Sequence, residues 1–309
     1  MSLRQRVHVL LPLVLSVCAL PACGSAPSGL QSQRATVAGR ERRWLLHLPR
    51  DYAVTRTWPL VVIFHGHYGT PAGIARLTGL DRMADREGFI AVYPAGIARS
   101  WAAGLNAPAD RMRIDDVAFV SGLIARLETE YPIDTRHVVL AGFSNGAHLV
   151  ELLGCRLAAQ VTAIVPVSGT LAAAAAGGCH PARPLTVVEF HGMQDPVDPY
   201  SGGVIHVHHG GAVLPVITNI EDWARWDRCP GPARQRHLGV ADHGARELTY
   251  GPCAAGTTVR LYALEDGGHT WPGGPQYLPS FIIGAATHVI NASAILGDVA
   301  VRGAPPPGE

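Results

Sequence analysis

A short motif between a buried strand and a helix constrains this chain more than any other feature. The apolar run at residues 138–141 leads into G-F-S-N-G at residues 142–146, with Ser144 at its centre, and residues 146–157 have helical spacing. A G-x-S-x-G sequence in this setting is typical of a sharp turn that holds the serine hydroxyl above the end of a sheet. The motif also occurs in ordinary glycine-rich turns, so its partners decide its meaning.

Apolar, strand-like runs alternate with helical segments along most of the chain. This alternation predicts a mostly parallel sheet covered by helices on both faces, because strands buried on both sides read as continuous apolar runs. The predicted strands are residues 43–48, 58–64, 89–93, 138–141, 161–167, 185–190 and 258–264, and the predicted helices are residues 73–86, 115–130, 146–157, 219–227 and 287–296.

Two later loops supply the partners that a nucleophilic serine needs. Asp195 follows one apolar strand, and His269 follows the last one. In the α/β-hydrolase fold an acid and then a histidine follow the serine, each at the carboxyl end of a later strand. The order Ser144, Asp195, His269 therefore predicts an α/β-hydrolase fold with a catalytic triad. Asp198 is the competing acid, with a turn before Pro199 as its ordinary explanation.

Acyl transfer also needs backbone N–H donors for the negative oxygen of the tetrahedral intermediate. Asn145, the residue after the serine, is expected to supply one of them. The loop after the strand at residues 58–64 is expected to supply the other, with the N–H of His67 as the first choice. Trp101 and Trp271 are candidates for an aromatic pocket wall, and core packing explains them equally well.

The amino terminus has the pattern of an export signal. Two arginines precede a mainly apolar run at residues 7–20, which is shorter than the roughly 20 apolar residues of a membrane span. The run ends in L-P-A-C-G, which is similar to a bacterial lipobox and makes Cys23 the expected lipidation site. Cleavage after Ala26 is the alternative. We therefore expect a secreted protein that is anchored outside the cell membrane as a lipoprotein.

One catalytic domain is expected after this signal. We assign residues 1–22 to the signal peptide, residues 23–38 to a flexible tether, residues 39–302 to the α/β-hydrolase domain and residues 303–309 to a disordered tail. Four cysteines remain in the domain: Cys155, Cys179, Cys229 and Cys253. An even set in an exported protein predicts two disulfides, and three pairings are possible from the residues alone.

Charge and composition exclude some partners. With 25 basic and 24 acidic residues the formal net charge is +1, which gives no field to attract nucleic acid. No C-x-x-C pair is present, and the histidines at positions 206, 208 and 209 lack neighbouring cysteines or carboxylates, so neither a metal nor a cofactor is expected. We expect a monomer that meets a membrane only through its lipid and acts on a small or oligomeric ester.

Several motifs together resemble one known family. These are F-H-G at residues 64–66, D-D-V-A-F at 115–119, the serine motif, F-H-G-M-Q-D-P-V-D-P-Y at 190–200 and G-H-T-W-P-G at 268–273. In this order they resemble the polyhydroxybutyrate depolymerase-like esterases, a group that includes feruloyl and acetylxylan esterases of the carbohydrate esterase type. The resemblance covers about residues 40–300.

The resemblance implies a secreted serine esterase without a metal or organic cofactor. It favours the pairs Cys155–Cys179 and Cys229–Cys253, and it implies feruloyl, acetyl or short hydroxyalkanoate esters as substrates. Two other functions are compatible with the same residues. One is a surface-anchored acyltransferase that uses an acceptor other than water, and the other is a binding protein of hydrolase fold without turnover.

Overall fold

The computed structural model describes residues 29–205, 210–240 and 243–304. Within these ranges ten strands form one sheet, in the order β1-β2-β4-β3-β5-β6-β7-β12-β11-β10. In chain order the strands are β1 (Gln31–Val37), β2 (Arg40–His47), β3 (Trp58–Phe64), β4 (Ile90–Pro94), β5 (Ile133–Phe143), β6 (Ala163–Val167), β7 (Thr186–Gly192), β10 (Arg234–Leu238), β11 (Ala245–Tyr250) and β12 (Val259–Leu264). A separate pair joins β8 (Gly203–Val204) to β9 (Ala212–Val213).

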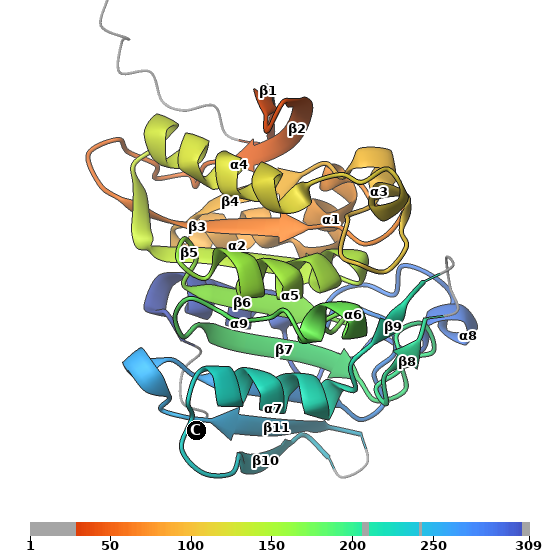
Figure 1. Cartoon of the computed structure of the whole chain (residues 1–309). Coiled ribbons are helices and arrows are strands. Elements are labelled where there is room, and N and C mark those ends of the chain that lie inside the picture. The colour runs from red at the N-terminus through yellow and green to blue at the C-terminus, as the bar shows by residue number, and fades with distance from the viewer. Residues whose placement is uncertain (1–28, 206–209, 241–242, 305–309) are drawn as a thin grey trace, which may run out of the picture.

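The centre of the sheet is parallel, and its edges are antiparallel. Strands β4, β3, β5, β6, β7 and β12 run parallel to one another. The pairs β1–β2, β2–β4, β12–β11 and β11–β10 are antiparallel. Because parallel strands end at the same edge of a sheet, the loops after β3, β5, β7 and β12 meet on one side of the molecule, at the right in Figure 1.

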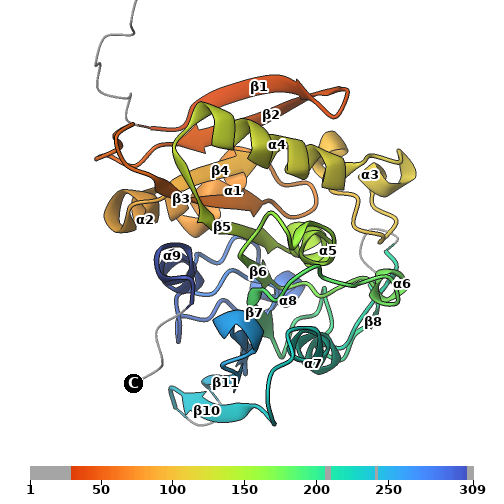
Figure 2. The same ribbon diagram turned by 60° about the vertical axis from the view of Figure 1, so that its left-hand side comes forward.

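Helices cover both faces of the sheet. Figure 2 shows α4, α5 and α7 on one face and α1, α2 and α9 on the other. The helices are α1 (Pro71–Thr78), α2 (Leu80–Glu87), α3 (Pro108–Arg111), α4 (Asp116–Glu130), α5 (Asn145–Leu157), α6 (Ala173–Ala176), α7 (Val216–Trp226), α8 (Ser280–Ile283) and α9 (Ala292–Arg302), with short 3-10 turns η1 (Ile97–Arg99) and η3 (Ala254–Gly256). Each face has its own apolar core, and this arrangement confirms the predicted α/β-hydrolase fold.

Helix boundaries follow from local chemistry. The single helix predicted for residues 73–86 is two helices, because Gly79 has a φ of 58° and ends α1 before α2 begins. Asp115 caps α4 by accepting a hydrogen bond from the N–H of Ala118, as an acidic helix start predicts. Its neighbour Asp116 has another role: it is 1% exposed and forms an ion pair of 2.7 Å with the equally buried Arg42.

The predicted tether is wrong in its second half. Residues Gln31–Val37 form β1, which pairs with β2 across a turn at Ala38 and Gly39, where both φ angles are positive. This strand is polar and only half-buried, so its sequence resembles a linker and its structure comes from pairing with β2. The predicted signal peptide, Cys23 and residues 305–309 of the predicted tail lie outside the described residues.

Both disulfides have the pairing that the resemblance implies. Cys155 at the end of α5 is bonded to Cys179, and Cys229 after α7 is bonded to Cys253. Each closes a loop with a sequence separation of 24 residues, for which cross-linking contributes roughly 3 kcal/mol to stability. None of the helices in the described ranges has the length and apolar character needed to cross a bilayer.

A buried carboxyl group at the end of α7 makes a stability prediction possible. Asp227 is fully buried at the C-cap of α7 and accepts hydrogen bonds from the N–H of Leu185 at 3.2 and 3.1 Å. Burial raises the pKa of Asp227 to about 7. The negative end of the helix dipole also disfavours an ionised carboxylate at this position. The unfolded chain therefore loses this proton first, and stability falls as pH rises from about 4 to about 7.

We expect Asp227→Asn to stabilise the protein at neutral and alkaline pH, because the amide carries no charge to bury. At pH 8 the free energy of unfolding should exceed that of the unsubstituted protein by about 2 kcal/mol, and at pH 4 the difference should vanish. Urea denaturation of both proteins at the two pH values measures this. An identical difference at pH 4 and pH 8 would contradict the assignment.

Candidate active site

Ser144 lies on a turn that only glycine neighbours allow. Its φ of 56° and ψ of −123° mark a strained turn between β5 and α5. A Cβ atom on Gly142 would lie 2.2 Å from the carbonyl oxygen of Gly146, and one on Gly146 would lie 2.3 Å from the carbonyl oxygen of Phe64. The two glycines of the motif therefore let β5, α5 and β3 approach closely while the half-buried Ser144 remains accessible at the edge of the sheet.

The structure brings Ser144, His269 and Asp195 together. Nε2 of His269 lies 2.8 Å from Oγ of Ser144, and Nδ1 lies 2.8 Å from Oδ2 of Asp195. A carboxylate only accepts hydrogen bonds, so Nδ1 carries the ring proton and Nε2 is left to accept from the serine hydroxyl. This is the geometry that a histidine needs to remove a proton from a serine.

The loop after β12 fixes the imidazole of His269. A Cβ atom on Gly268 would lie 2.2 Å from the carbonyl oxygen of Ile283, so the backbone before the histidine packs against α8. The hydroxyl of Tyr277 donates a hydrogen bond of 3.1 Å to the carbonyl oxygen of His269. The ring of Phe143 packs at 5.1 Å from the imidazole, between ring centres. The histidine is only 4% exposed, and these contacts restrict its orientation.

Asp195 occupies a turn that holds its charge. Its Oδ1 accepts hydrogen bonds of 2.8 Å from the N–H groups of Val197 and Asp198, while Oδ2 faces His269. Burial alone would raise the pKa of this carboxyl, but the charge and hydrogen bond of His269, the charge of His191 and the N–H of Asp198 together lower it. Asp195 is therefore ionised at neutral pH, and the competing Asp198 instead forms an ion pair with His148.

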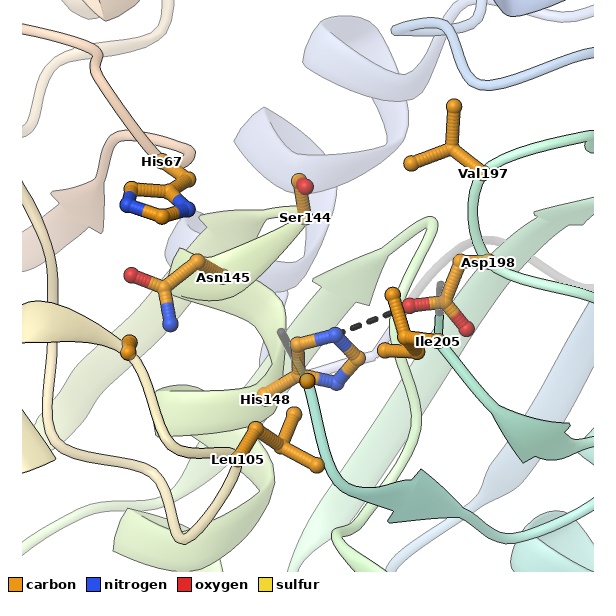
Figure 3. A pocket seen from close by; sticks show the side chains of 10 residues that line it. His67, Leu105, Ser144, Asn145, His148, Val197, Asp198 and Ile205 are labelled. Atoms are coloured by element: carbon orange, nitrogen blue, oxygen red, sulfur yellow. Dashed lines mark ion pairs between the residues drawn. The ribbon is translucent and has the colours of Figure 1, made fainter. Parts of the chain in front are cut away.

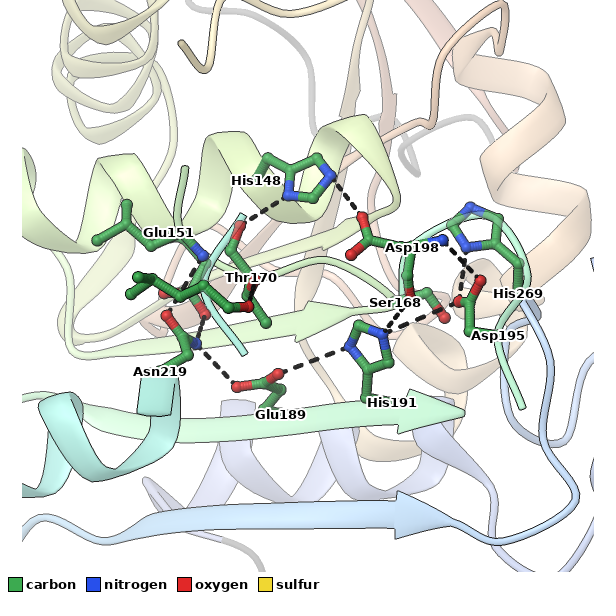
Figure 4. A network of polar contacts seen from close by, with 12 residues as sticks. His148, Glu151, Ser168, Thr170, Glu189, His191, Asp195, Asp198, Asn219 and His269 are labelled. Carbon is green, nitrogen blue, oxygen red and sulfur yellow. Dashed lines mark hydrogen bonds and ion pairs between the residues drawn. The ribbon is translucent and has the colours of Figure 1, made fainter. Parts of the chain in front are cut away.

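A buried polar network extends from Asp195 below the sheet edge, as Figure 4 shows. His191 Nε2 lies 4.0 Å from Oδ2 of Asp195 and donates to the carbonyl oxygen of Asp198 at 2.9 Å. Its Nδ1 lies 3.7 Å from Glu189, a carboxylate on β7 that is 0% exposed. Burial lowers the pKa of His191, but Glu189, Asp198 and Asp195 raise it further, to about 9. His191 is thus a buried cation that stabilises the charge of Asp195.

The network ends in a second buried carboxyl. Asn219 of α7 donates to Glu189 at 2.9 Å and to Glu151 of α5 at 3.1 Å. Glu151 also accepts from the indole N–H of Trp223 at 2.6 Å, and burial together with the charge of Glu189 raises its pKa to about 8. These residues were not predicted from the sequence. The signal was present, since Glu189 interrupts an otherwise apolar strand.

The opposite side of Ser144 is built from β3 and the segment around Trp101. Asn145 is the first residue of α5, so its N–H lies at the helix N-terminus beside Ser144. Its side chain accepts from the N–H of Trp101 at 2.7 Å and donates to the carbonyl oxygen of the same residue at 3.2 Å. His65 is neutral, because burial lowers its pKa to about 4, and its Nε2 accepts from the N–H of Gly96 at 3.1 Å. These contacts fix the loop that carries His67.

A cavity of about 50 Å³ opens beside Ser144 (Figure 3). It is lined by His67, Leu105, Ala107, Ser144, Asn145, His148, Val197, Asp198, Ile205 and Gly210. The residues predicted to supply the two N–H donors, Asn145 and His67, therefore share this cavity with the serine.

The predicted aromatic walls are wrong. Trp101 is 0% exposed and Trp271 is 1% exposed, and neither is among the described residues that line the cavity. The indole N–H of Trp101 donates to the carbonyl oxygen of His65, and that of Trp271 donates to Ser293 of α9. Both indoles are core residues, because each N–H has a partner inside the protein.

No three His, Cys, Asp or Glu side chains in the described ranges gather as metal ligands. The histidines at positions 206, 208 and 209 lie outside these ranges.

Comparison with known proteins identifies the group to which this site belongs. The family model described as Esterase PHB depolymerase matches residues 43–207. Feruloyl esterase B of Piromyces equi is 27% identical over 74% of this chain, which corresponds to 42% of that protein's length. NocK of Nocardia uniformis subsp. tsuyamanensis, which is named as a putative esterase, is 28% identical over 88% of this chain and 83% of its own length.

A solved structure has the same fold. The acetyl xylan esterase from Aspergillus awamori superposes with a TM-score of 0.57 at 13% identity and covers 78% of this chain and 94% of its own. At this identity the similarity shows the fold alone. The family match spans more than half of the sequence. The chain therefore belongs to the Esterase PHB depolymerase family and is a carboxylic ester hydrolase.

Proposed function

We propose that the chain is an exported serine esterase in which Ser144 is the nucleophile, His269 the general base and Asp195 the residue that orients and stabilises the histidine. The observation that carries this proposal is the continuous contact from Oγ of Ser144 through both ring nitrogens of His269 to Asp195, with 2.8 Å at each step. The same serine lies at a strained turn beside a cavity, as a nucleophile requires.

Acylation begins when Ser144 attacks the ester carbonyl. His269 Nε2 accepts the hydroxyl proton as the new C–O bond forms, and the ionised Asp195 stabilises the resulting imidazolium. The carbonyl oxygen becomes an oxyanion, for which the backbone N–H groups of Asn145 and His67 are the proposed donors. Their proposed role is supported by their place in the cavity that Ser144 lines.

Collapse of the intermediate expels the alcohol, which takes its proton from His269, and leaves the acyl group on Ser144. Water then enters, gives a proton to His269 and attacks the acyl carbonyl. The second intermediate breaks down to the free acid and regenerates the serine. Asp195 remains ionised through both half-reactions, since the N–H groups of its turn and the cation of His191 hold its pKa low.

Short acyl groups are the proposed substrates. The cavity volume of about 50 Å³ accommodates a few atoms, since one water needs roughly 10–15 Å³ by the same measure. Relatives are named feruloyl esterase and acetylxylan esterase, and the family description refers to PHB depolymerase. We therefore propose acetyl esters and short hydroxyalkanoate esters first, and hydroxycinnamoyl esters second.

Export is part of the proposal. The two disulfides support it, because such bonds persist in oxidising compartments. A signal peptide that ends before Cys23, with a lipid on this cysteine, is the proposed route; Cys23 itself lies outside the described residues.

A fluorophosphonate probe tests the nucleophile. Such probes bond to activated serines, so the unsubstituted protein should be labelled and Ser144→Ala should not. Ser121→Ala is a matched control, since this serine lies on α4 and accepts a hydrogen bond from Gln160. The control should be labelled like the unsubstituted protein. Equal labelling of Ser144→Ala would refute the assignment.

The choice of acid is tested by two amide substitutions. Asp195→Asn should lower kcat for 4-nitrophenyl butyrate by roughly 10³- to 10⁴-fold, because an amide does not stabilise the imidazolium of His269. Asp198→Asn should have a much smaller effect on the same substrate, since that side chain contacts His148. Steady-state kinetics measure both, and a larger loss for Asp198→Asn would reverse the assignment of the acid.

A further inference from the structure

A buried ion pair lies on the wall of the cavity beside Ser144. His148 belongs to α5, and Asp198 belongs to the turn that also carries Asp195. Their side chains are 3% and 2% exposed, with His148 Nε2 at 2.8 Å from Asp198 Oδ2. Figure 3 shows both side chains among those that surround the cavity. The proposed mechanism uses neither of these two side chains.

The hydrogen bonds of His148 define its charge. Nδ1 lies 2.7 Å from the carbonyl oxygen of Thr170, and Nε2 faces the carboxylate of Asp198. Both neighbours are acceptors, so both ring nitrogens must carry a proton, and the imidazole is a cation. Burial lowers the pKa of His148, but the charge and hydrogen bond of Asp198 and the hydrogen bond to Thr170 raise it further above its ordinary value. The pair is therefore neutral as a unit.

The second oxygen of Asp198 is the unusual atom of this pair. Asp198 Oδ1 is buried and has no hydrogen-bond partner among the residues that the structure describes. A buried carboxylate oxygen without a donor costs free energy. An ion pair that only joined α5 to the turn after β7 would need one oxygen. The other is left as an acceptor in a residue that lines the cavity next to the nucleophile.

We propose that Asp198 determines specificity by accepting, at Oδ1, a hydrogen bond from a hydroxyl group on the acyl part of the ester. The inference rests on the proposed function of Ser144, because it concerns the same cavity. The site would select short hydroxyacyl esters over the corresponding unsubstituted acyl esters, since an acyl chain without the hydroxyl leaves the carboxylate oxygen without a donor.

Charge and size favour this class of ligand. A substrate carboxylate would be repelled by Asp198, and an ammonium group would meet an acid whose charge His148 already neutralises at 2.8 Å. A neutral hydroxyl meets neither difficulty. Leu105, Val197 and Ile205 supply apolar walls for the carbon chain around it. The small volume suits the acyl group, which stays bonded to Ser144, whereas the leaving alcohol needs a path to solvent.

Two esters with one leaving group, 4-nitrophenyl 3-hydroxybutyrate and 4-nitrophenyl butyrate, test the proposal. We expect the unsubstituted enzyme to hydrolyse the hydroxylated ester with the higher kcat/KM. In the double variant His148→Leu/Asp198→Val the ratio of the two kcat/KM values should fall roughly ten- to a hundredfold. Removing both partners leaves no uncompensated buried charge, so the fold should persist. Differences in intrinsic reactivity between the esters cancel when the two enzymes are compared. A ratio that is the same in both would overturn the proposal.

A second variant separates recognition from a structural role. In Asp198→Asn the amide oxygen can accept from His148, which turns the amide nitrogen, a donor, toward the cavity. A 3-methoxybutyrate ester accepts hydrogen bonds and donates none, so its kcat/KM relative to the 3-hydroxybutyrate ester should rise at least severalfold in this variant. A purely structural pair would change both esters equally, and that result would refute the proposal.

The proposed function fails separately. If Ser144→Ala still hydrolysed 4-nitrophenyl butyrate, the nucleophile assignment would be wrong whatever the ester ratios. If Ser144→Ala were inactive while the ratios stayed constant in the variants of His148 and Asp198, only the recognition of the hydroxyl would be wrong.

Discussion

The close approach of three backbones at Gly142 and Gly146 is the constraint on which the rest of the site depends. Any side chain at these positions would collide with the carbonyl oxygens of Gly146 or Phe64, at 2.2 and 2.3 Å. The turn therefore places Ser144 where the parallel strands β3, β5, β7 and β12 end together. Loops that are far apart in the sequence then supply His269, which contacts the serine, and Asp195, which contacts the histidine.

Buried charges around this turn are paired or hydrogen-bonded, and they appear where loops must be held still. Arg42 and Asp116 form an ion pair, and Asp116 also accepts from the N–H of Ala102, which fixes the segment next to Trp101. His191 holds the charge of Asp195, and Glu189 holds His191. Each of these groups would be costly alone in the core. Together they connect the position of the reacting groups to the stability of the fold.

The sequence predicted the central strands and the order of the three reacting residues well, because apolar runs and a glycine-bounded serine are local signals. Strands β1, β10 and β11 escaped prediction, since their polar sequences are defined by pairing with β2 and β12. The contact of His148 with Asp198 joins residues about fifty positions apart and left no local pattern. Trp101 was misassigned because its composition suggests a pocket, while its N–H bonds to His65 in the core.

A crystal structure of the protein after reaction with a 4-nitrophenyl alkylphosphonate would test the central claim most directly, since the adduct imitates the tetrahedral intermediate. The account predicts phosphorus bonded to Oγ of Ser144, with the phosphonyl oxygen within hydrogen-bond distance of the N–H groups of Asn145 and His67. His269 should remain bonded to Asp195, as in the free protein. Phosphorus on another residue, or a phosphonyl oxygen turned away from Asn145, would contradict the account.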